Sequence, residues 1–282
     1  MNYARIVGMS CALIASVAAT SSFAETKVTL RSELTQQPLN PARGEASPQA
    51  NVLWGDITKD VPSGIILEFA DGFSSPPHIH NITYRAIVIE GAIHNDDPGA
   101  AVMSMGPGSF WVQPAGEDHV TSTVAAGGAV AFLEILEGPY LVQPSDEAFE
   151  NSERPLNLVF DNIVWLPAED MRWLGVPGAA SSDGAEMALL WGDLEVGKLS
   201  GTLLKVPAGT QGTLTGQDTL LRSVVIQGAV GLDVLGKGQT VELEPGSFFS
   251  ASAGDANMLT CTADTECTVY LRTKGTYSFV AK

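Results

Sequence analysis

Two halves of this chain repeat one pattern of residues, and this repeat constrains the fold more than any other feature. The stretch LWGDITKDVPSGIILEFADG at 53–72 is matched by LWGDLEVGKLSGTLLKVPAG at 190–209, a shift of 137 residues. YRAIVIEGA at 84–92 is matched by LRSVVIQGA at 221–229 at the same shift. Each copy is about the size of an ordinary domain, so the chain is predicted to fold as two similar units.

The pattern within each copy predicts β-strands. YRAIVIEG alternates apolar and polar residues and ends at a turn glycine, and GIILEF and GTLLKV are short apolar runs. The 29 glycines and 16 prolines are spread over all 282 residues, which suits many turns better than long helices. Many short strands without crossover helices predict an all-β fold, with a sandwich or barrel in each copy.

Residues 1–24 are predicted to be a secretory signal peptide. Arg5 supplies a positive charge, and the apolar stretch 6–19 is too short to span a bilayer well. Ser22 and Ala24 are small residues at the −3 and −1 positions of a cleavage site. We therefore expect a mature chain that starts at Glu25 and is periplasmic or secreted; the alternative is an uncleaved N-terminal anchor.

The net charge of −17 argues against partners that require a basic surface. Nucleic acids and anionic membranes both bind through Lys and Arg, so no nucleic-acid partner and no membrane contact after signal cleavage are expected. The expected partner is a small-molecule ligand or substrate. Exposed sheet edges could also pair to form a homodimer.

Cys261 and Cys267 flank the sequence TADTE, which is predicted to form the tip of a hairpin. Two cysteines that face each other across antiparallel strands in an oxidising compartment could form a disulfide. The alternative is two buried free thiols, because the sequence does not give the cross-strand geometry.

Three of the four histidines fall in two short motifs of the first copy. GFSSPPHIHNITYRAIVIEG at 72–91 contains His78 and His80, and GSFWVQPAGEDH at 108–119 ends at His119. Alternate residues of a strand face the same side, so His78 and His80 are predicted to point into the barrel together. His119 can approach from a neighbouring strand. Three imidazoles on one side of a metal leave positions open for water or substrate.

These two motifs resemble those of the cupin superfamily. The first copy more narrowly resembles the ChrR-like cupins, and the arrangement with two copies, WGD and PPHIHN is similar to the bacterial family DUF4437 over about residues 28–280. The resemblance implies a bicupin of two double-stranded β-helix (jelly-roll) barrels. The N-terminal barrel, with the metal site, would span 25–156 and the C-terminal barrel 157–282.

The resemblance implies that His78, His80 and His119 hold one divalent transition metal, with iron, zinc, manganese and nickel all open. Cupin motifs usually carry a glutamate where this chain has Tyr84. The site would then be like that of the three-histidine cupin dioxygenases that cleave diketones or oxidise thiols. Tyr84 is the candidate catalytic residue: it could bind the metal weakly, donate a hydrogen bond to a bound ligand, or only fill core volume.

Several other residues near the motifs also have predicted positions or roles. Trp111 and Gln113 alternate on the strand that leads into the second motif and are candidate pocket residues, although core packing explains Trp111 equally well. By strand parity His94 is predicted to face outward. Arg85 recurs as Arg222 in the second copy, which favours a structural role.

The second copy is predicted to lack the metal site. At offsets of 137 residues for the first motif and 138 for the second, its motif positions are occupied by Thr215, Gln217, Leu221 and Asn257. None of these residues is a good ligand for a transition metal. We therefore expect the second barrel to act as a scaffold and as one wall of the first barrel's pocket.

Together these features predict an exported cupin metalloprotein, a dioxygenase-like oxidoreductase that acts on a small metal-chelating organic substrate. The alternatives are a binding module that captures a metal or small ligand without turnover, a Lewis-acid isomerase, lyase or hydrolase, and a structural protein with a vestigial site. Export weakens the case for iron, because a protein that folds after secretion takes its metal outside the cytoplasm. There, imidazole sites bind copper and zinc more tightly than Fe(II).

Overall fold

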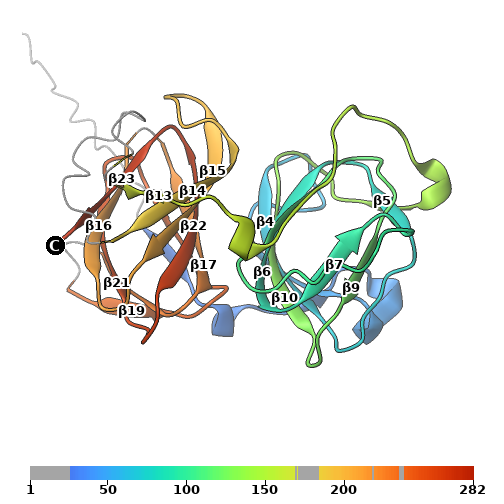
Figure 1. Ribbon diagram of the computed structural model, residues 1–282, viewed down its shortest axis with the longest axis horizontal. Coiled ribbons are helices and arrows are strands. Elements are labelled where there is room, and N and C mark those ends of the chain that lie inside the picture. Colours follow the sequence, from blue (N-terminus) through green and yellow to red (C-terminus); the bar gives the residue numbers. More distant parts are fainter. Residues whose placement is uncertain (1–25, 169, 171–183, 218, 235–237) are drawn as a thin grey trace, which may run out of the picture.

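The computed structural model describes residues 26–168, 170, 184–217, 219–234 and 238–282, and the predicted signal peptide lies outside them. Two β-barrels stand side by side (Figure 1), which confirms the predicted all-β fold with one barrel per repeat. Within the described residues, no helix has both the length and the apolar character needed to cross a membrane.

The first barrel is built around a seven-stranded antiparallel sheet of order β12-β8-β6-β10-β4-β3-β2. Its strands are β2 (Gln37–Pro38), β3 (Gln49–Trp54), β4 (Ser63–Phe69), β6 (Tyr84–Gly91), β8 (Phe110–Gln113), β10 (Ala129–Ile135) and β12 (Leu156–Leu158). Two strand pairs complete it, β5 (His78–His80) with β11 (Val142–Pro144), and β7 (Ile93–Asp96) with β9 (Val120–Thr123). Short 3-10 turns are η1 (Arg31–Glu33), η2 (Pro41–Ala46), η3 (Ser145–Glu147) and η4 (Phe160–Asn162).

The second barrel consists of a seven-stranded sheet, β1-β20-β17-β22-β15-β14-β13, and a five-stranded sheet, β19-β18-β21-β16-β23. The first has β1 (Lys27–Thr29), β13 (Leu166–Pro167), β14 (Glu186–Gly192), β15 (Leu199–Val206), β17 (Leu221–Gln227), β20 (Phe248–Ala251) and β22 (Cys267–Lys274). The second has β16 (Gln211–Gly216), β18 (Val230–Val234), β19 (Thr240–Leu243), β21 (Ala256–Cys261) and β23 (Tyr277–Ala281).

The N-terminal strand β1 does not lie in the barrel that follows it in sequence. It pairs antiparallel with β20, so it belongs to the sheet of the second barrel, although the predicted range of the first barrel, 25–156, includes it. In return, β12 extends past the expected boundary at 156 and pairs with β8 of the first barrel. Each exchanged strand covers a sheet edge that would otherwise expose unpaired N–H and C=O groups.

A third hydrophobic core, formed by residues of both barrels, lies between them and is separate from the core inside each barrel. The ring of Phe132 packs against that of Tyr270 with 5.1 Å between centroids, and these residues occupy equivalent strand positions in the two copies. Trp54 of the first barrel packs at 5.1 Å against Phe248 of the second. The interface therefore relates the barrels by an approximate two-fold axis, as in a symmetric dimer.

A buried ion pair lies at the same interface. Glu134 of β10 pairs with the guanidinium of Arg272 of β22, and both are almost fully buried. The hydroxyl of Tyr270 donates to the second Glu134 carboxylate oxygen at 2.5 Å. Glu134 and Arg272 are also equivalent in the two copies, so the axis brings unlike charges together where identical copies would place like charges.

The repeated arginines contact the tryptophans of the opposite barrel. Arg85 lies over the ring of Trp191 at 4.6 Å, and Arg222 lies over the ring of Trp54 at 5.6 Å. These cation–π contacts explain why both copies have the arginine and the tryptophan, and they agree with the structural role predicted for the arginines.

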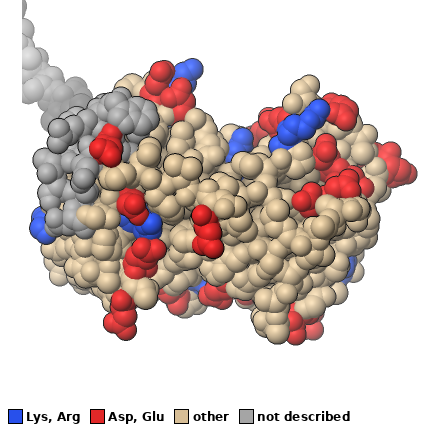
Figure 2. Space-filling model, in the orientation of Figure 1, with Lys and Arg blue, Asp and Glu red and all other residues tan. Residues whose placement is uncertain are grey.

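Cys261 at the end of β21 and Cys267 at the start of β22 are joined by a disulfide, with 5.6 Å between their Cα atoms. The exterior of the molecule is acidic, and Figure 2 shows Asp and Glu side chains over both barrels of the visible face. This distribution matches the net charge of −17.

Candidate metal centre

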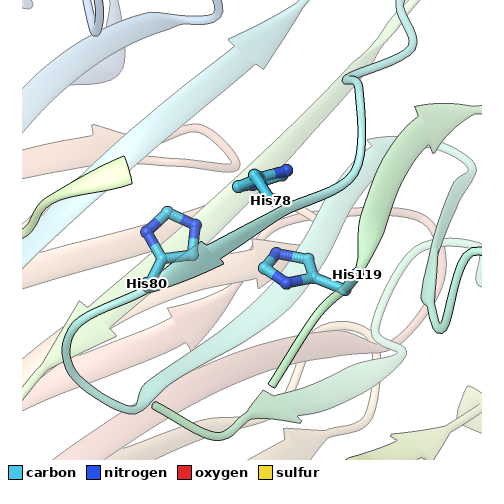
Figure 3. A group of neighbouring side chains, drawn as sticks. All are labelled: His78, His80 and His119. Carbon is cyan, nitrogen blue, oxygen red and sulfur yellow. The ribbon is translucent and has the colours of Figure 1, made fainter. Parts of the chain in front are cut away.

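The backbone of the first barrel brings His78, His80 and His119 together. His78 and His80 lie on β5 with Ile79 between them, and Ile79 is fully buried on the opposite face. His119 forms an antiparallel bridge with His78, with reciprocal backbone hydrogen bonds of 3.0 Å. One ring nitrogen from each histidine lies within 4.8 Å of the others, and the three rings converge in Figure 3.

Backbone carbonyls fix the tautomer of all three imidazoles. The Nδ1 atom lies 2.9 Å from the Pro76 oxygen in His78, 2.9 Å from the Leu141 oxygen in His80, and 3.1 Å from the Glu117 oxygen in His119. A carbonyl oxygen only accepts, so each Nδ1 carries the hydrogen and each Nε2 keeps its lone pair. This arrangement is typical of metal-binding histidines, whose second nitrogen is held by a backbone or carboxylate acceptor.

The surroundings keep the three rings neutral. Burial lowers the pKa of His78 and of His80, and the neighbouring imidazoles lower that of His80 further. Burial, followed by repulsion from His78, lowers the pKa of His119 to about 3. Three neutral imidazoles with converging lone pairs fit a divalent transition metal, because a metal needs the unprotonated nitrogen.

Tyr84 lies beside this cluster at the start of β6. Its hydroxyl is 3.4 Å from His119 Nε2 and 3.0 Å from Asn95 Oδ1, and only 2% of the residue is exposed. Burial raises the pKa of Tyr84 above its ordinary value, so the phenol stays protonated at neutral pH. The hydroxyl of Tyr84 therefore lies beside the histidine cluster.

Gln113 is linked to Tyr84 through Asn95, and it is not among the residues that line the pocket. Asn95 Nδ2 donates to Gln113 Oε1 at 2.9 Å, and Gln113 Nε2 donates to the Glu117 carbonyl at 3.1 Å. Trp111, by contrast, lines the pocket wall. The buried amide of Asn95 could not be assigned from the sequence, because its role depends on strands β7 and β8 meeting in space.

Tyr140 was missed by the sequence reasoning. It lies in the segment between β10 and β11, and its ring stacks on His80 with 4.3 Å between centroids and 17° between planes. Its hydroxyl is 3.2 Å from His80 Nε2, the nitrogen that faces the cluster. Burial raises the pKa of Tyr140 well above its usual value. No motif spacing includes position 140, so only the fold identifies it.

A pocket opens beside the cluster, with about 110 Å³ accessible to the centres of water-sized molecules. Its walls are mainly apolar and include Leu67, Phe69, Phe73, Trp111 and Leu133. Arg43 of η2 is exposed at its edge, contributes to the electrostatic field at His78, and forms no ion pair with any residue that the structure describes. The pocket thus combines an apolar body, a metal-type cluster and a free cation.

His94 lies outside the cluster. Its neighbour Ile93 is fully buried in the barrel core, as parity predicts for adjacent residues. His94 was predicted to face outward, and it is only 4% exposed. The backbone N–H of Met103 donates to His94 Nδ1 at 3.2 Å.

The second barrel presents different residues at the histidine positions from those given by a constant offset. His78 is bridged to His119, and Asn257, the equivalent of His119, is paired with Leu214. Leu214, and not Thr215, is therefore the counterpart of His78. It is fully buried in the core of the second barrel.

The same correction applies to His80. The N–H of Gly116 donates to the His80 oxygen, and the N–H of Gly254 donates to the Gly216 oxygen, both at 2.8 Å. The counterpart of His80 is therefore Gly216, and the assignment of Gln217 from the sequence was wrong. Glycine has no side chain to offer a metal.

The shift has a local cause. Ser75 and Gly212 are equivalent, since they oppose equivalent residues of β9 and β21. The first barrel then has Pro76 and Pro77 where the second has Thr213 alone. The second barrel gains one residue in the next turn, which restores the offset and conceals the shift in the sequence. Among the described residues, the group of His, Cys, Asp or Glu side chains placed to hold a metal is the one in the first barrel.

Comparison with solved structures shows the cupin fold. A candidate dioxygenase from Nostoc punctiforme aligns with a TM-score of 0.64 at 12% identity, over 88% of this chain and 82% of that one. Salicylate 1,2-dioxygenase from Pseudaminobacter salicylatoxidans aligns with a TM-score of 0.56 at 14% identity, over 93% of this chain and 88% of that one. A point mutant of oxalate decarboxylase from Bacillus subtilis aligns with a TM-score of 0.57 at 12% identity, over 90% of this chain and 78% of that one.

No curated protein matches the sequence. The sequence model of DUF4437, described as a domain of unknown function, matches residues 27–280, which include both barrels and the three histidines. The chain therefore belongs to the DUF4437 family, and its fold is that of a two-barrel cupin.

Proposed function

We propose that this chain is an exported metal-dependent oxidoreductase in which His78, His80 and His119 hold one divalent transition metal. The observation that carries the proposal is the convergence of one ring nitrogen from each of three histidines, whose Nδ1 atoms all contact backbone carbonyls and so leave Nε2 free for a metal. Such an arrangement costs burial of three polar rings, which a purely structural barrel does not need.

The pocket supports a small anionic organic substrate. Three neutral imidazoles leave the charge of a divalent metal uncompensated, so an anionic oxygen chelate is favoured as the further ligand. The apolar walls suit a hydrocarbon body, and Arg43 at the edge suits a carboxylate. We expect the substrate to bind the metal through oxygen and to bury an apolar portion beside Trp111.

The side chains of the site favour redox chemistry over hydrolysis or isomerisation. Iron would supply O2-dependent oxidation, whereas zinc, manganese or nickel would act as a Lewis acid. The titratable side chains that line the pocket are His78, His80, Tyr84, Tyr140 and Arg43. With the histidines on the metal and both phenols held protonated, none is poised to serve as a general base at neutral pH.

The same observation supports one alternative from another class, a binding module that captures a metal or small ligand without turnover. An oxidase and a binding module share the site and differ only in whether bound substrate is converted. Consumption of O2 by the loaded protein with a panel of apolar carboxylates separates the two.

Export to the periplasm or beyond is part of the proposal. The Cys261–Cys267 disulfide supports it, because disulfides persist in oxidising compartments and are rare in the cytosol. The signal sequence in residues 1–24 supplies the route. Mass spectrometry of the exported protein should give a mature N-terminus at Glu25.

Elemental analysis of the mature protein tests the metal site. We expect about one equivalent of a transition metal in the wild type and none in His78→Ala/His119→Ala. His94→Gln is the matched control, since it removes an imidazole outside the cluster and keeps an acceptor for the Met103 N–H. A wild type that holds no metal and takes up none of Fe(II), Mn(II), Zn(II) or Ni(II) would overturn the proposal.

A further inference from the structure

A directional chain of hydrogen bonds runs behind the metal cluster. It begins at the backbone carbonyl of Glu117, which can only accept, so the side chain of Gln113 must present its NH2 group there. The oxygen of Gln113 then faces Asn95, which must present its own NH2 group. The positions of the oxygen and nitrogen atoms in both side-chain amides therefore follow from the Glu117 carbonyl, because that oxygen can accept only from an NH2 group.

The chain ends at the oxygen of Asn95. This oxygen accepts from the hydroxyl of Tyr84 at 3.0 Å and from that of Thr121 at 2.7 Å. The hydrogen of the Tyr84 hydroxyl therefore points away from the cluster. Its oxygen lone pairs face His119 Nε2, which is also a lone pair, across 3.4 Å. Two acceptors that face each other need a cation or a donor between them.

Tyr140 has the opposite polarity. The only acceptor within reach of its hydroxyl among the described residues is His80 Nε2, at 3.2 Å. When that nitrogen binds a metal, its lone pair is used, and the hydrogen of Tyr140 must turn to another acceptor beside the metal. The stacked position of the Tyr140 ring on His80 keeps the hydroxyl at the site while it turns.

The second barrel acts as an internal control for the network. The positions of Tyr84, Asn95, Gln113 and Thr121 are occupied there by Leu221, Leu232, Ala251 and Leu259. All four are buried in an intact barrel of the same fold. The fold can therefore be completed with apolar residues at these positions, and the polar network serves the metal site.

We propose that the two tyrosines give the open side of the metal site opposite hydrogen-bonding polarity, so that Tyr140 donates to an anionic oxygen of the ligand and Tyr84 accepts from a ligand hydroxyl. Asn95 is the positioning residue that holds the Tyr84 hydrogen away from the ligand. The ligand class that satisfies both groups is a hydroxycarboxylate, with one anionic oxygen and one oxygen that carries a hydrogen. This assignment rests on the proposed metal site.

The test uses the full mature protein loaded with Co(II), whose visible spectrum reports ligand binding. The two probes are hydroxyacetate and methoxyacetate, which differ in the hydrogen of the second oxygen. The variants are Tyr84→Phe, Tyr140→Phe and Asn95→Leu, the last of which introduces the residue that the second barrel has. Cobalt content and circular dichroism are measured on every sample.

We expect the wild type to prefer hydroxyacetate. Tyr84→Phe should reduce this preference by about tenfold, and Asn95→Leu should reduce it while Tyr84 is still present. Tyr140→Phe should weaken the binding of both probes by about tenfold and leave the ratio of their affinities unchanged. A purely structural role for Asn95 would alter stability without altering the ratio.

Each other result decides against the assignment. A Tyr84→Phe variant with the wild-type ratio, or a Tyr140→Phe variant with wild-type affinities, would overturn it while the cobalt content shows that the metal site stands. A wild type that binds neither Co(II) nor any of Fe(II), Mn(II), Zn(II) and Ni(II) would instead overturn the proposed function, on which the assignment rests. If Asn95→Leu fails to fold, the two phenylalanine variants still decide.

Discussion

The ion pair between Glu134 and Arg272 should dominate the response of the inter-barrel interface to mutation. Glu134→Ala leaves a guanidinium that is 6% exposed without its counter-charge and leaves the Tyr270 hydroxyl without its acceptor. Removal of one partner of a buried ion pair costs about 3–5 kcal/mol. For a chain of this length, a loss of that size lowers Tm by roughly 6–20 °C.

The pair itself should be dispensable for stability. Burial raises the pKa of Glu134 even though Arg272 and Tyr270 oppose that shift, which indicates that desolvation outweighs the attraction. A double variant, Glu134→Met/Arg272→Met, removes both charges and keeps the volume. It should recover the stability to within about 1 kcal/mol of the wild type, or exceed it.

Urea unfolding of the wild type, Glu134→Met, Arg272→Met and the double variant gives a double-mutant cycle, and Glu134→Ala is measured beside it. Circular dichroism follows the strands, and the tryptophan fluorescence includes that of Trp54 and Trp191 at the interface. Glu134→Gln is the conservative control, because it keeps an acceptor for Tyr270 without the charge, and its loss should be smaller than that of Glu134→Ala. The reasoning is refuted if Glu134→Ala costs less than about 1 kcal/mol, or if the single losses simply add in the double variant.

Three further predictions follow from the same structure. Loading with metal at 100 times its Kd should raise the free energy of unfolding by about 2.7 kcal/mol, and His78→Ala should abolish that increment in a thermal melt. The apoprotein should lose stability as the pH falls below about 6.5, because the unfolded chain then binds protons at His78, His80 and His119, whose pKa values burial lowers in the folded chain, that of His119 to about 3. The slope should exceed the roughly 1.4 kcal/mol per pH unit of one histidine, and it should fall by about that amount in His119→Gln. Cys261→Ser/Cys267→Ser should cost about 2 kcal/mol in urea unfolding, with unchanged metal stoichiometry because the disulfide lies in the other barrel; loss of metal in this variant would contradict the independence of the two barrels.

Much of the fold could be read from the sequence because the signals were local. Strand alternation and the 137-residue repeat predicted two β-barrels, since each barrel's strands follow one another along the chain. Parity along one strand was enough to bring His78 and His80 to one side. The exchange of β1 between barrels could not be anticipated, because three residues carry no information about which distant edge they will cover.

The polar surroundings of the site were less accessible to sequence reasoning. Tyr140 reaches His80 across 60 positions of sequence, and Asn95 reaches Tyr84 from a different strand pair. Such contacts depend on the closed barrel and leave no spacing to recognise. The counterparts of His78 and His80 in the second copy were misassigned for another reason. One residue is lost before them and one is gained after them, so the offset of 137 fits on both sides of β5 and fails only within it.

This difference of one residue has a consequence for how a duplicated barrel can change its role. Because side chains alternate across a strand, the loss of one residue between Ser75 and His78 would turn both histidines of β5 outward in a single step. A compensating residue in the next turn would leave the following strands in phase. One copy of a duplicated gene can thus be released from metal binding by a change of length, without a gradual replacement of ligands, while its barrel and its contacts with the other copy persist.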